Sequence, residues 1–281
     1  MTIPSTAPGA SRPEGAARPA DLRERFRALH RPGEPFVLPN AWDCASAAAL
    51  VAAGFPALGT TSLGVACAAG LPDAGAAREE TLRPARSLAR LPVPVTVDVE
   101  AGSGGGPQEV ARLAARLDAA GVAGINIEDR RPDGTLADPA AQGELIRAVK
   151  DAAPHLFVNA RTDTHWLPGH REQTGRRLAA YVAAGADGLF VPGLVEEGAI
   201  RSVAVEFPRP LTVLHLPGRT VPERLAELGV ARISTGSLLF RAAVDRAVEV
   251  ALAAARGADA PGAAGTTAYA TALEWSAPYA P

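Results

Sequence analysis

The chain has 281 residues, and its contents of 47% hydrophobic and 21% charged residues are ordinary for a folded globular protein. A formal net charge of -2 provides no basic field for binding a nucleic acid. Gly, Pro or a charged residue interrupts every apolar run before it reaches the roughly 18 residues that a membrane span needs. The two cysteines, Cys44 and Cys67, have neither CxxC nor metal-ligand spacing. We therefore expect a cytoplasmic protein with reduced cysteines and no disulfide framework.

The two ends of the chain differ in composition from its middle. Residues 1–20 are rich in Pro, Ala, Gly and Ser and contain no apolar segment of the kind found in signal peptides, so we expect a disordered extension. Residues 21–256 are expected to form one catalytic domain. Residues 257–281 carry Tyr269, Leu273, Trp275 and Tyr279 among flexible residues. An apolar tail of this kind is expected to pack on another surface, such as a neighbouring subunit.

Short apolar runs alternate with segments of helical periodicity along the middle of the chain. The expected strands cover residues 36–38, 57–60, 95–99, 124–128, 157–161, 188–191, 211–214 and 231–234. The expected helices cover residues 21–29, 41–53, 79–90, 107–120, 140–152, 174–184, 196–207, 222–228 and 237–255, and residues 61–73 are expected to form a loop. About eight strand–helix units predict an α/β fold, the (β/α)8 TIM barrel. A doubly wound open sheet is the alternative, and it is disfavoured because the first strand is not followed by a GxGxxG sequence.

Two neighbouring strands of this pattern end in carboxylates. In residues 95–100 the alternation places Asp98 and Glu100 on one face, and in residues 124–128 it places Glu128 and Asn126 on one face. Parallel strands side by side would bring the three carboxylates together at their C-terminal ends, where a barrel has its active site. Oxygen ligands suit Mg²⁺ or Mn²⁺, so we expect a metal site. The alternative is that each carboxylate caps a helix or pairs with an arginine.

Other candidates lie at the ends of further strands. Arg161 closes the FVNAR strand and offers a bidentate fork to a carboxylate or phosphate, unless it pairs with a strand-end carboxylate. The small-residue loop after residue 60 offers backbone N–H groups and hydroxyls to an anion, or is simply a tight turn. Asp73 is the acid of that loop. His165 is expected to line the mouth of the barrel, whereas His215 is expected to be structural.

These motifs resemble the phosphoenolpyruvate mutase/isocitrate lyase superfamily, in its carboxyvinyl-carboxyphosphonate phosphorylmutase-like branch. The resemblance covers residues 25–256. The sequence segments that show it are LPNAWDCASA, GTTSLG, GLPD, VTVDVEAGSG, GINIED, NARTD, AGADGLFVPG and GVARISTGS. It implies a Mg²⁺-dependent (β/α)8 barrel that forms homotetramers with the final helix swapped between subunits. It also implies chemistry on C–C or P–C bonds of 2-oxo acids and related carboxylates.

The resemblance assigns roles to individual residues of this sequence. It implies that Asp98 binds the metal directly, with Glu100 and Glu128 acting through water. The remaining expected site residues bind substrate (Asn40, Thr60, Thr61, Ser62, Leu63, Asp98, Arg161 and His165) or take part in catalysis (Arg161, Asp73 and Arg130). Within this set, the backbone of residues 61–63 and the Arg161 guanidinium are expected to hold the substrate carboxylate. Arg130 and Arg131 are expected to close over the site.

Departures from the family motifs narrow the expected reaction. The segment DRRPDGTLADPA after Glu128 lacks the Lys-Lys-Cys-Gly-His loop of isocitrate and methylisocitrate lyases. Gly59 and Pro192 stand where the phosphonate mutase has tryptophan and histidine, and Glu100 replaces the second aspartate. We therefore expect Mg²⁺-dependent C–C cleavage of an oxaloacetate-like dicarboxylate through a metal-stabilised enolate. The alternatives are P–C bond hydrolysis or rearrangement of a phosphonopyruvate-like substrate, and a catalytically silent barrel that binds a 2-oxo acid.

Overall fold

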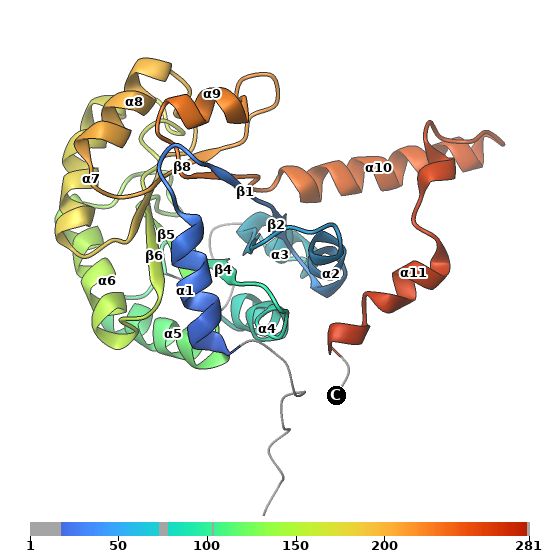
Figure 1. Ribbon diagram of the computed structural model, residues 1–281, viewed down its shortest axis with the longest axis horizontal. Coiled ribbons are helices and arrows are strands. Elements are labelled where there is room, and N and C mark those ends of the chain that lie inside the picture. The colour runs from blue at the N-terminus through green and yellow to red at the C-terminus, as the bar shows by residue number, and fades with distance from the viewer. Residues whose placement is uncertain (1–17, 73–77, 103, 280–281) are drawn as a thin grey trace, which may run out of the picture.

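A computed structural model describes residues 18–72, 78–102 and 104–279 of the protein. All paired strands are parallel and form one sheet in the order β1-β9-β8-β7-β6-β5-β4-β3-β2 (Figure 1). The strands are β1 (Phe36–Leu38), β2 (Asn40–Ala41), β3 (Leu58–Thr60), β4 (Val95–Asp98), β5 (Gly124–Glu128), β6 (Phe157–Arg161), β7 (Gly188–Phe190), β8 (Leu211–Leu214) and β9 (Arg232–Ser234). This arrangement confirms the expected (β/α)8 TIM barrel.

The barrel closes through an interrupted first strand. β1 pairs with β9 and β2 pairs with β3, so the chain changes partner at Pro39 between them. Proline has no N–H to donate, which favours a break in the ladder at this position. The Pro39 carbonyl still accepts a hydrogen bond from the Gly59 amide at 2.9 Å. The nine strand segments among the described residues therefore correspond to the eight strands expected from the sequence.

Helices connect the strands along the outside of the barrel, where α5 to α8 form the outer arc seen in Figure 1. The α-helices are α1 (Pro19–Leu29), α2 (Cys44–Ala52), α3 (Ser62–Ala68), α4 (Arg78–Leu88), α5 (Pro107–Ala120), α6 (Pro139–Ala152), α7 (Thr174–Ala183), α8 (Glu197–Glu206), α9 (Pro222–Glu227), α10 (Leu238–Ala255) and α11 (Tyr269–Glu274). Helix α5 illustrates how a helix packs on the barrel through an apolar stripe. Its buried residues recur at helical spacing and are Val110, Leu113, Ala114 and Leu117. Each of the larger side chains contributes about 1.5–3 kcal/mol of hydrophobic stabilisation.

Two expectations for the helices were wrong. The helix expected from residue 41 begins at Cys44, because Asn40 and Ala41 pair as a strand and Asp43 caps the helix by accepting the Ser46 amide at 2.7 Å. The loop expected over residues 61–73 contains α3, which begins at Ser62. Its small residues pack closely: a Cβ at Gly64 would lie 2.9 Å from the Trp42 Cβ. Small side chains can indicate a close helix contact as well as a loop.

The middle of the barrel interior holds polar side chains, while the outer faces of the strands are apolar. Outward-facing side chains such as Ile125 and Ile127 are buried against the helices. Their neighbour Asn126 faces inward and bonds to Asn159 of β6 and Arg232 of β9. Hydrogen bonds between three different strands place these side chains inside the barrel.

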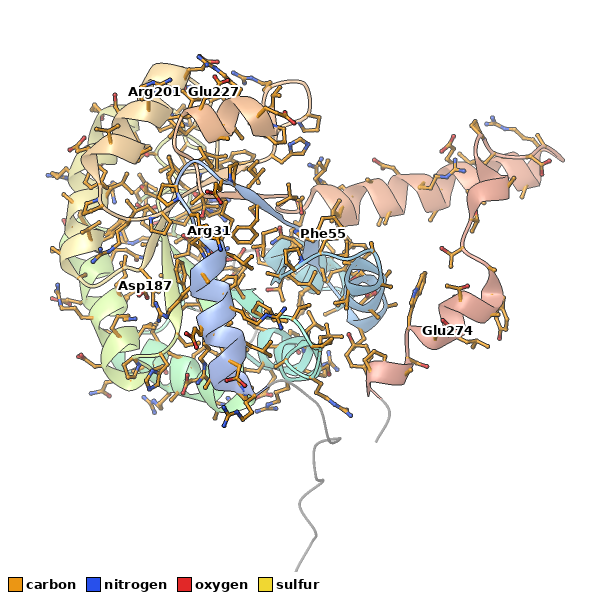
Figure 2. All side chains as sticks on the ribbon, in the orientation of Figure 1. Arg31, Phe55, Asp187, Arg201, Glu227 and Glu274 are labelled. Carbon is orange, nitrogen blue, oxygen red and sulfur yellow. The ribbon has the colours of Figure 1, made fainter. Side chains whose placement is uncertain are left out.

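The C-terminal segment leaves the barrel. α10 extends away from the sheet with no buried residue, and α11 folds back beside the barrel (Figures 1 and 2). At its end the Tyr279 hydroxyl donates to the Cys44 carbonyl at 3.1 Å, and Arg90 donates to the Tyr279 carbonyl at 3.1 Å. The tail therefore contacts its own barrel at Tyr279. Within the described residues, none of the helices combines the length and the hydropathy required to cross a membrane.

Candidate active site

A cavity of about 440 Å³ opens at the C-terminal ends of the strands. Five of the expected substrate-binding residues line it from the first two barrel strands and the start of α3: Asn40, Thr60, Thr61, Ser62 and Leu63. Asp98, Arg130 and Arg161 line it from the ends of β4 to β6 and the loop between them. The structure thus brings eight expected site residues, far apart in the sequence, around one space at the catalytic end of a barrel.

Asp98 ends β4 and is held by its own backbone surroundings. Its amide donates to the Thr60 hydroxyl at 2.9 Å, and its Oδ1 accepts the Glu100 amide at 3.3 Å. This turn places Glu100 at φ +52°, the one positive φ of a non-glycine residue within the described parts of the chain. Such a conformation costs of order 1–3 kcal/mol and is concentrated at functional sites. Because the strand has ended, the alternation used for Val95 to Asp98 does not apply to Glu100.

Glu128 and Arg161 face each other across neighbouring strands. They are register partners in the β5–β6 ladder, and the Glu128 Oε2 lies 2.7 Å from the Arg161 Nη1. The other edge of the Arg161 guanidinium donates to both Asp163 oxygens, at 2.6 and 2.9 Å. The ion pair suggested as the alternative role of Arg161 is therefore present. Two of its five N–H donors form hydrogen bonds to Asp163 and Nη1 forms the ion pair with Glu128, which leaves N–H donors available to a ligand.

The electrostatics of this cluster favour a bound cation. Burial raises the pKa of Glu128, and the Asp163, Asp98 and Glu100 carboxylates raise it further, while the Arg161 guanidinium opposes them. Burial alone would lower the pKa of Arg161, but Glu128 and Asp163 outweigh it and raise that pKa. Four carboxylates thus act on one another around one arginine. A cation bound among them would lower this repulsion.

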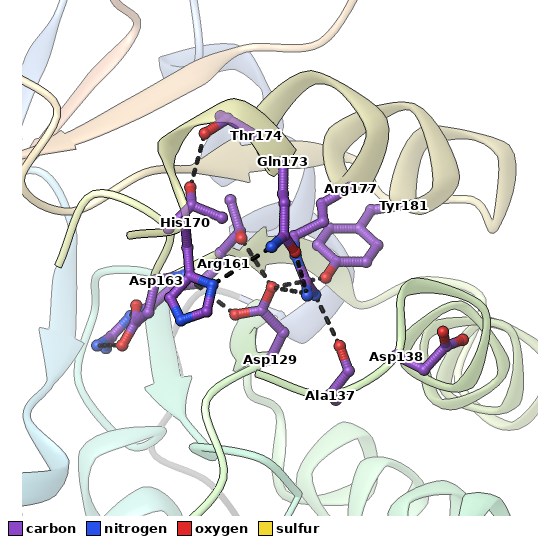
Figure 3. Close-up of polar contacts among 12 residues, drawn as sticks. Asp129, Ala137, Asp138, Arg161, Asp163, His170, Gln173, Thr174, Arg177 and Tyr181 are labelled. Atoms are coloured by element: carbon purple, nitrogen blue, oxygen red, sulfur yellow. Dashed lines mark hydrogen bonds and ion pairs between the residues drawn. The ribbon is translucent and has the colours of Figure 1, made fainter. Parts of the chain in front are cut away.

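Asp129, the residue after Glu128, accepts several hydrogen bonds close to Asp163 and Arg161 (Figure 3). It is fully buried, and its Oδ2 accepts hydrogen bonds from Thr162 at 2.7 Å, Tyr181 at 2.7 Å and Arg177 at 3.2 Å. Its Oδ1 accepts the Asp163 amide at 3.0 Å. Because Asp163 in turn holds the Arg161 guanidinium, α7 and the Asp129 carboxylate together fix the arginine that faces the cavity.

The Asn40 side chain forms hydrogen bonds that help to close the barrel. Its Oδ1 accepts from the Ser234 hydroxyl at 3.0 Å, the Thr235 amide at 3.1 Å and the Gly236 amide at 3.0 Å. Its Nδ2 donates to the Thr60 carbonyl at 2.8 Å. The side chain ties the last barrel strand to the first two. Contact with a substrate therefore stays a prediction.

The backbone expected to hold a substrate carboxylate is only partly available. The Thr61 amide donates to the Ala41 carbonyl at 3.1 Å and belongs to the sheet. The amides of Ser62 and Leu63 lie in the first turn of α3, where N–H groups have no intrahelical acceptor. Two of the three expected amides can therefore face a ligand.

Other expected residues lie away from the cavity. Arg130 lines it, but Arg131 borders a separate cavity beside α6. The ring of His165 is buried outside the lining, with its Nδ1 3.9 Å from Glu196. Asp73 lies outside the described residues. The expected roles of His165, Arg131 and Asp73 therefore have no support from a contact observed among the described residues and stay predictions.

Several lining residues were missed by the sequence reasoning. Asn126, Trp166, Phe190, His215 and Arg241 all border the cavity. Asn126 could have been found, since it shares the inward face with Glu128. His215 was expected to be structural, and its Nδ1 does bond the Thr220 hydroxyl at 2.9 Å while the residue borders the cavity. Arg241 belongs to α10, and no pattern in the sequence indicates that it borders the site.

The residues fit a divalent cation that keeps much of its water. The candidate donors are all carboxylate oxygens, and among them Asp98 borders the cavity while Glu128 is turned toward Arg161. Within the described residues, no group of three His, Cys, Asp or Glu side chains is arranged to hold a metal on its own. Mg²⁺ commonly binds through one or two carboxylates and retains several waters. Direct binding by Asp98, with the other carboxylates acting through water, is consistent with this arrangement.

The sequence matches the profile of the family described as phosphoenolpyruvate phosphomutase over residues 26–255. The chain belongs to this family. It is 44% identical over 239 residues to the uncharacterized protein Rv1998c of Mycobacterium tuberculosis, covering 84% of this chain and 91% of that protein. It is 33% identical over 201 residues to a 2-methylisocitrate lyase of Bacillus subtilis, covering 68% and 66% of the two chains. A crystal structure of a putative lyase/mutase from Burkholderia cenocepacia superposes with a TM-score of 0.83 at 35% identity, covering 92% and 96%.

Proposed function

We propose that this protein is a Mg²⁺-dependent enzyme that cleaves a C–C bond in a small 2-oxo or 2-hydroxy dicarboxylate resembling oxaloacetate, by hydrolysis or retro-aldol cleavage. One observation carries the proposal: a carboxylate suited to a hard cation, Asp98, and a fixed arginine, Arg161, border the same cavity. A substrate that presents one acidic group beside an oxo or hydroxyl oxygen would meet both. The similarity to a 2-methylisocitrate lyase supports lyase-type chemistry.

Asp98 would bind Mg²⁺ directly, and Glu100 and Glu128 would act through its waters. The bound cation supplies a Lewis acid that stabilises negative charge developing on the substrate oxygen as the neighbouring bond breaks. The N–H donors of Arg161 that make no hydrogen bond to Asp163 would bind the substrate carboxylate, with the Ser62 and Leu63 amides as further donors.

Arg130 would bind the distal acidic group of the substrate. It lines the cavity, and its Nε is buried without a hydrogen-bond partner among the described residues. A buried, unsatisfied donor costs about 1–3 kcal/mol, which an acidic ligand would recover. The short loop that carries it is pinned at its base, where the Ala137 amide donates to the Asp129 carbonyl at 2.7 Å.

P–C chemistry on a phosphonopyruvate-like substrate is the second candidate. It is favoured by the phosphomutase family to which the chain belongs. It is disfavoured by Gly59 and Pro192, which replace the tryptophan and histidine of the mutase motif. A silent, 2-oxo acid-binding barrel is the third candidate, because the segment that follows Glu128 supplies neither Cys nor His as a general acid.

We also propose that the protein is a cytoplasmic homo-oligomer. Val244, Val248 and Leu252 of α10 are 47–53% exposed, and no part of the described chain covers them. A second copy of this chain that exchanges the final helix would bury this apolar surface. The expected cytoplasmic location rests on composition and would be tested by cell fractionation.

The function is tested by incubating purified protein and Mg²⁺ with oxaloacetate, substituted malates, methylisocitrate and phosphonopyruvate. We expect turnover of a dicarboxylate that EDTA abolishes and that Asp98→Ala lowers at least about 1,000-fold, equivalent to about 4 kcal/mol. Asp151→Ala is the matched control, because this exposed aspartate lies in the last turn of α6, at the opposite face of the barrel. Phosphate release from phosphonopyruvate alone would favour the second candidate. Silence across the panel with Mg²⁺-dependent oxalate binding intact would favour the third.

A further inference from the structure

Arg232 is a fully buried arginine inside the barrel, below the cavity. It belongs to β9 and is 0% exposed. Its Nη2 donates to the Asn126 Oδ1 at 2.7 Å, and its Nη1 lies 3.4 Å from the His30 Nε2. Its Nε has no hydrogen-bond partner within the described residues. Burying a guanidinium is costly, so its role needs an explanation beyond packing.

The arginine fixes the orientation of the Asn126 amide. A guanidinium can only donate hydrogen bonds, so the atom of Asn126 that faces Arg232 must be the carbonyl oxygen. The same Oδ1 accepts a second hydrogen bond from the Asn159 Nδ2 at 2.9 Å. Rotating the amide by 180° would direct an NH₂ group at two donors. The network itself therefore decides the assignment of the amide, which is otherwise ambiguous for asparagine.

The Nδ2 of Asn126 is consequently turned away from Arg232 and Asn159, toward the space above them. Asn126 borders the cavity. It is the register partner of Asp98, so its donor lies on the strand beside the expected metal ligand. Within the described chain its Nδ2 makes no hydrogen bond. A preorganised donor at the floor of an active site is worth most where negative charge develops.

We propose that Asn126 is a substrate-contacting residue whose Nδ2 donates a hydrogen bond to the oxo or enolate oxygen of the substrate, and that Arg232 is the positioning residue that holds this donor in place. The proposal rests on the proposed function and deepens it. It requires a ligand with an acceptor oxygen on the Asp98 side of the cavity. A planar dicarboxylate such as oxalate, which carries acceptor oxygens only, is therefore the appropriate probe.

The test compares Asn126→Asp with Thr96→Val. Aspartate keeps an oxygen for Arg232 and Asn159, so the fold is retained, but it replaces the donor above them with an anionic acceptor. We expect Asn126→Asp to weaken oxalate binding in the presence of Mg²⁺ at least about 30-fold by calorimetry. Thr96→Val removes a buried hydroxyl that has no partner among the described residues and does not border the cavity, so oxalate affinity should be unchanged.

A second measurement does not depend on a variant. A crystal structure of the wild-type protein with Mg²⁺ and oxalate should place the Asn126 Nδ2 within hydrogen-bond distance of an oxalate oxygen, about 2.7–3.2 Å. A distant Nδ2, or unchanged oxalate affinity in a folded Asn126→Asp, would overturn the inference and leave the proposed function standing. Oxalate binding that is sensitive to Asn126→Asp, without turnover of any substrate in the panel, would support the inference and refute the proposed reaction. Failure of the wild type to bind oxalate would refute both.

Discussion

Asp129 is the most informative position for testing how the site is held together. We predict that Asp129→Asn destabilises the protein by about 2–4 kcal/mol. The carboxylate accepts from three donors on Oδ2 (Thr162, Arg177 and Tyr181) and from the Asp163 amide on Oδ1. Asparagine has one oxygen, so it can serve the three donors or the single amide, but not both.

The magnitude follows from the better of these two choices. If the oxygen serves the three donors, the new NH₂ group faces the Asp163 amide and leaves a buried donor unsatisfied, at a cost of about 1–3 kcal/mol. The bond from Arg177 also loses its anionic partner, worth about 1–2 kcal/mol more, since charged hydrogen bonds are stronger than neutral ones. Arg177 keeps bonds to the Ala137 carbonyl at 2.7 Å and to Gln173, which limits the loss.

The assay is equilibrium unfolding in guanidinium chloride, with Tyr181→Phe as the matched control. The Tyr181 hydroxyl donates one neutral-to-anion bond to Asp129, and both burial and that carboxylate raise the pKa of Tyr181, so the tyrosine remains protonated. Its removal should cost about 1–2 kcal/mol. We would abandon this account of Asp129 if Asp129→Asn cost less than Tyr181→Phe, or if both variants lay within about 0.5 kcal/mol of the wild type, the range of ordinary surface substitutions.

Two further predictions concern stability and assembly. Burial, and secondarily Arg232, lowers the pKa of His30 from its ordinary 6.5 to about 3. Below pH 6.5 the unfolded chain therefore binds a proton at His30 that the folded chain does not bind. The free energy of unfolding consequently falls by about 1.4 kcal/mol for each unit by which the pH drops between these two values. The loss of unfolding free energy from pH 7.5 to pH 5 should be about 2 kcal/mol smaller in His30→Gln, and an unchanged pH dependence would contradict the assignment. Replacing Val248 of α10 by lysine should shift the protein toward monomers in light scattering, whereas Asp151→Lys should not; identical masses would show that α10 is not an interface.

The fold and much of the site were predictable from local patterns. Eight strand–helix units followed from apolar runs separated by helical periodicity. The positions of Asp98, Arg130 and Arg161 followed from the rule that loops after parallel strands meet at one end of a barrel. The alternation rule did not extend to Glu100, because β4 ends at Asp98 and the next residues turn. It did cover Asn126, whose inward direction was visible in the sequence although its role was not.

Local, periodic patterns in the sequence are sufficient to identify the residues at the strand ends. The tertiary structure determines which of these residues meet. In the folded chain Glu128 forms an ion pair with Arg161 instead of lining the cavity, and hydrogen bonds through Asp163 and Asp129 fix the position of Arg161. It also placed Arg232 beneath Asn126, 106 residues away in the chain. Such contacts depend on how strands are ordered around a closed barrel and on the cost of burying charge without a partner, and neither quantity is encoded within a single strand.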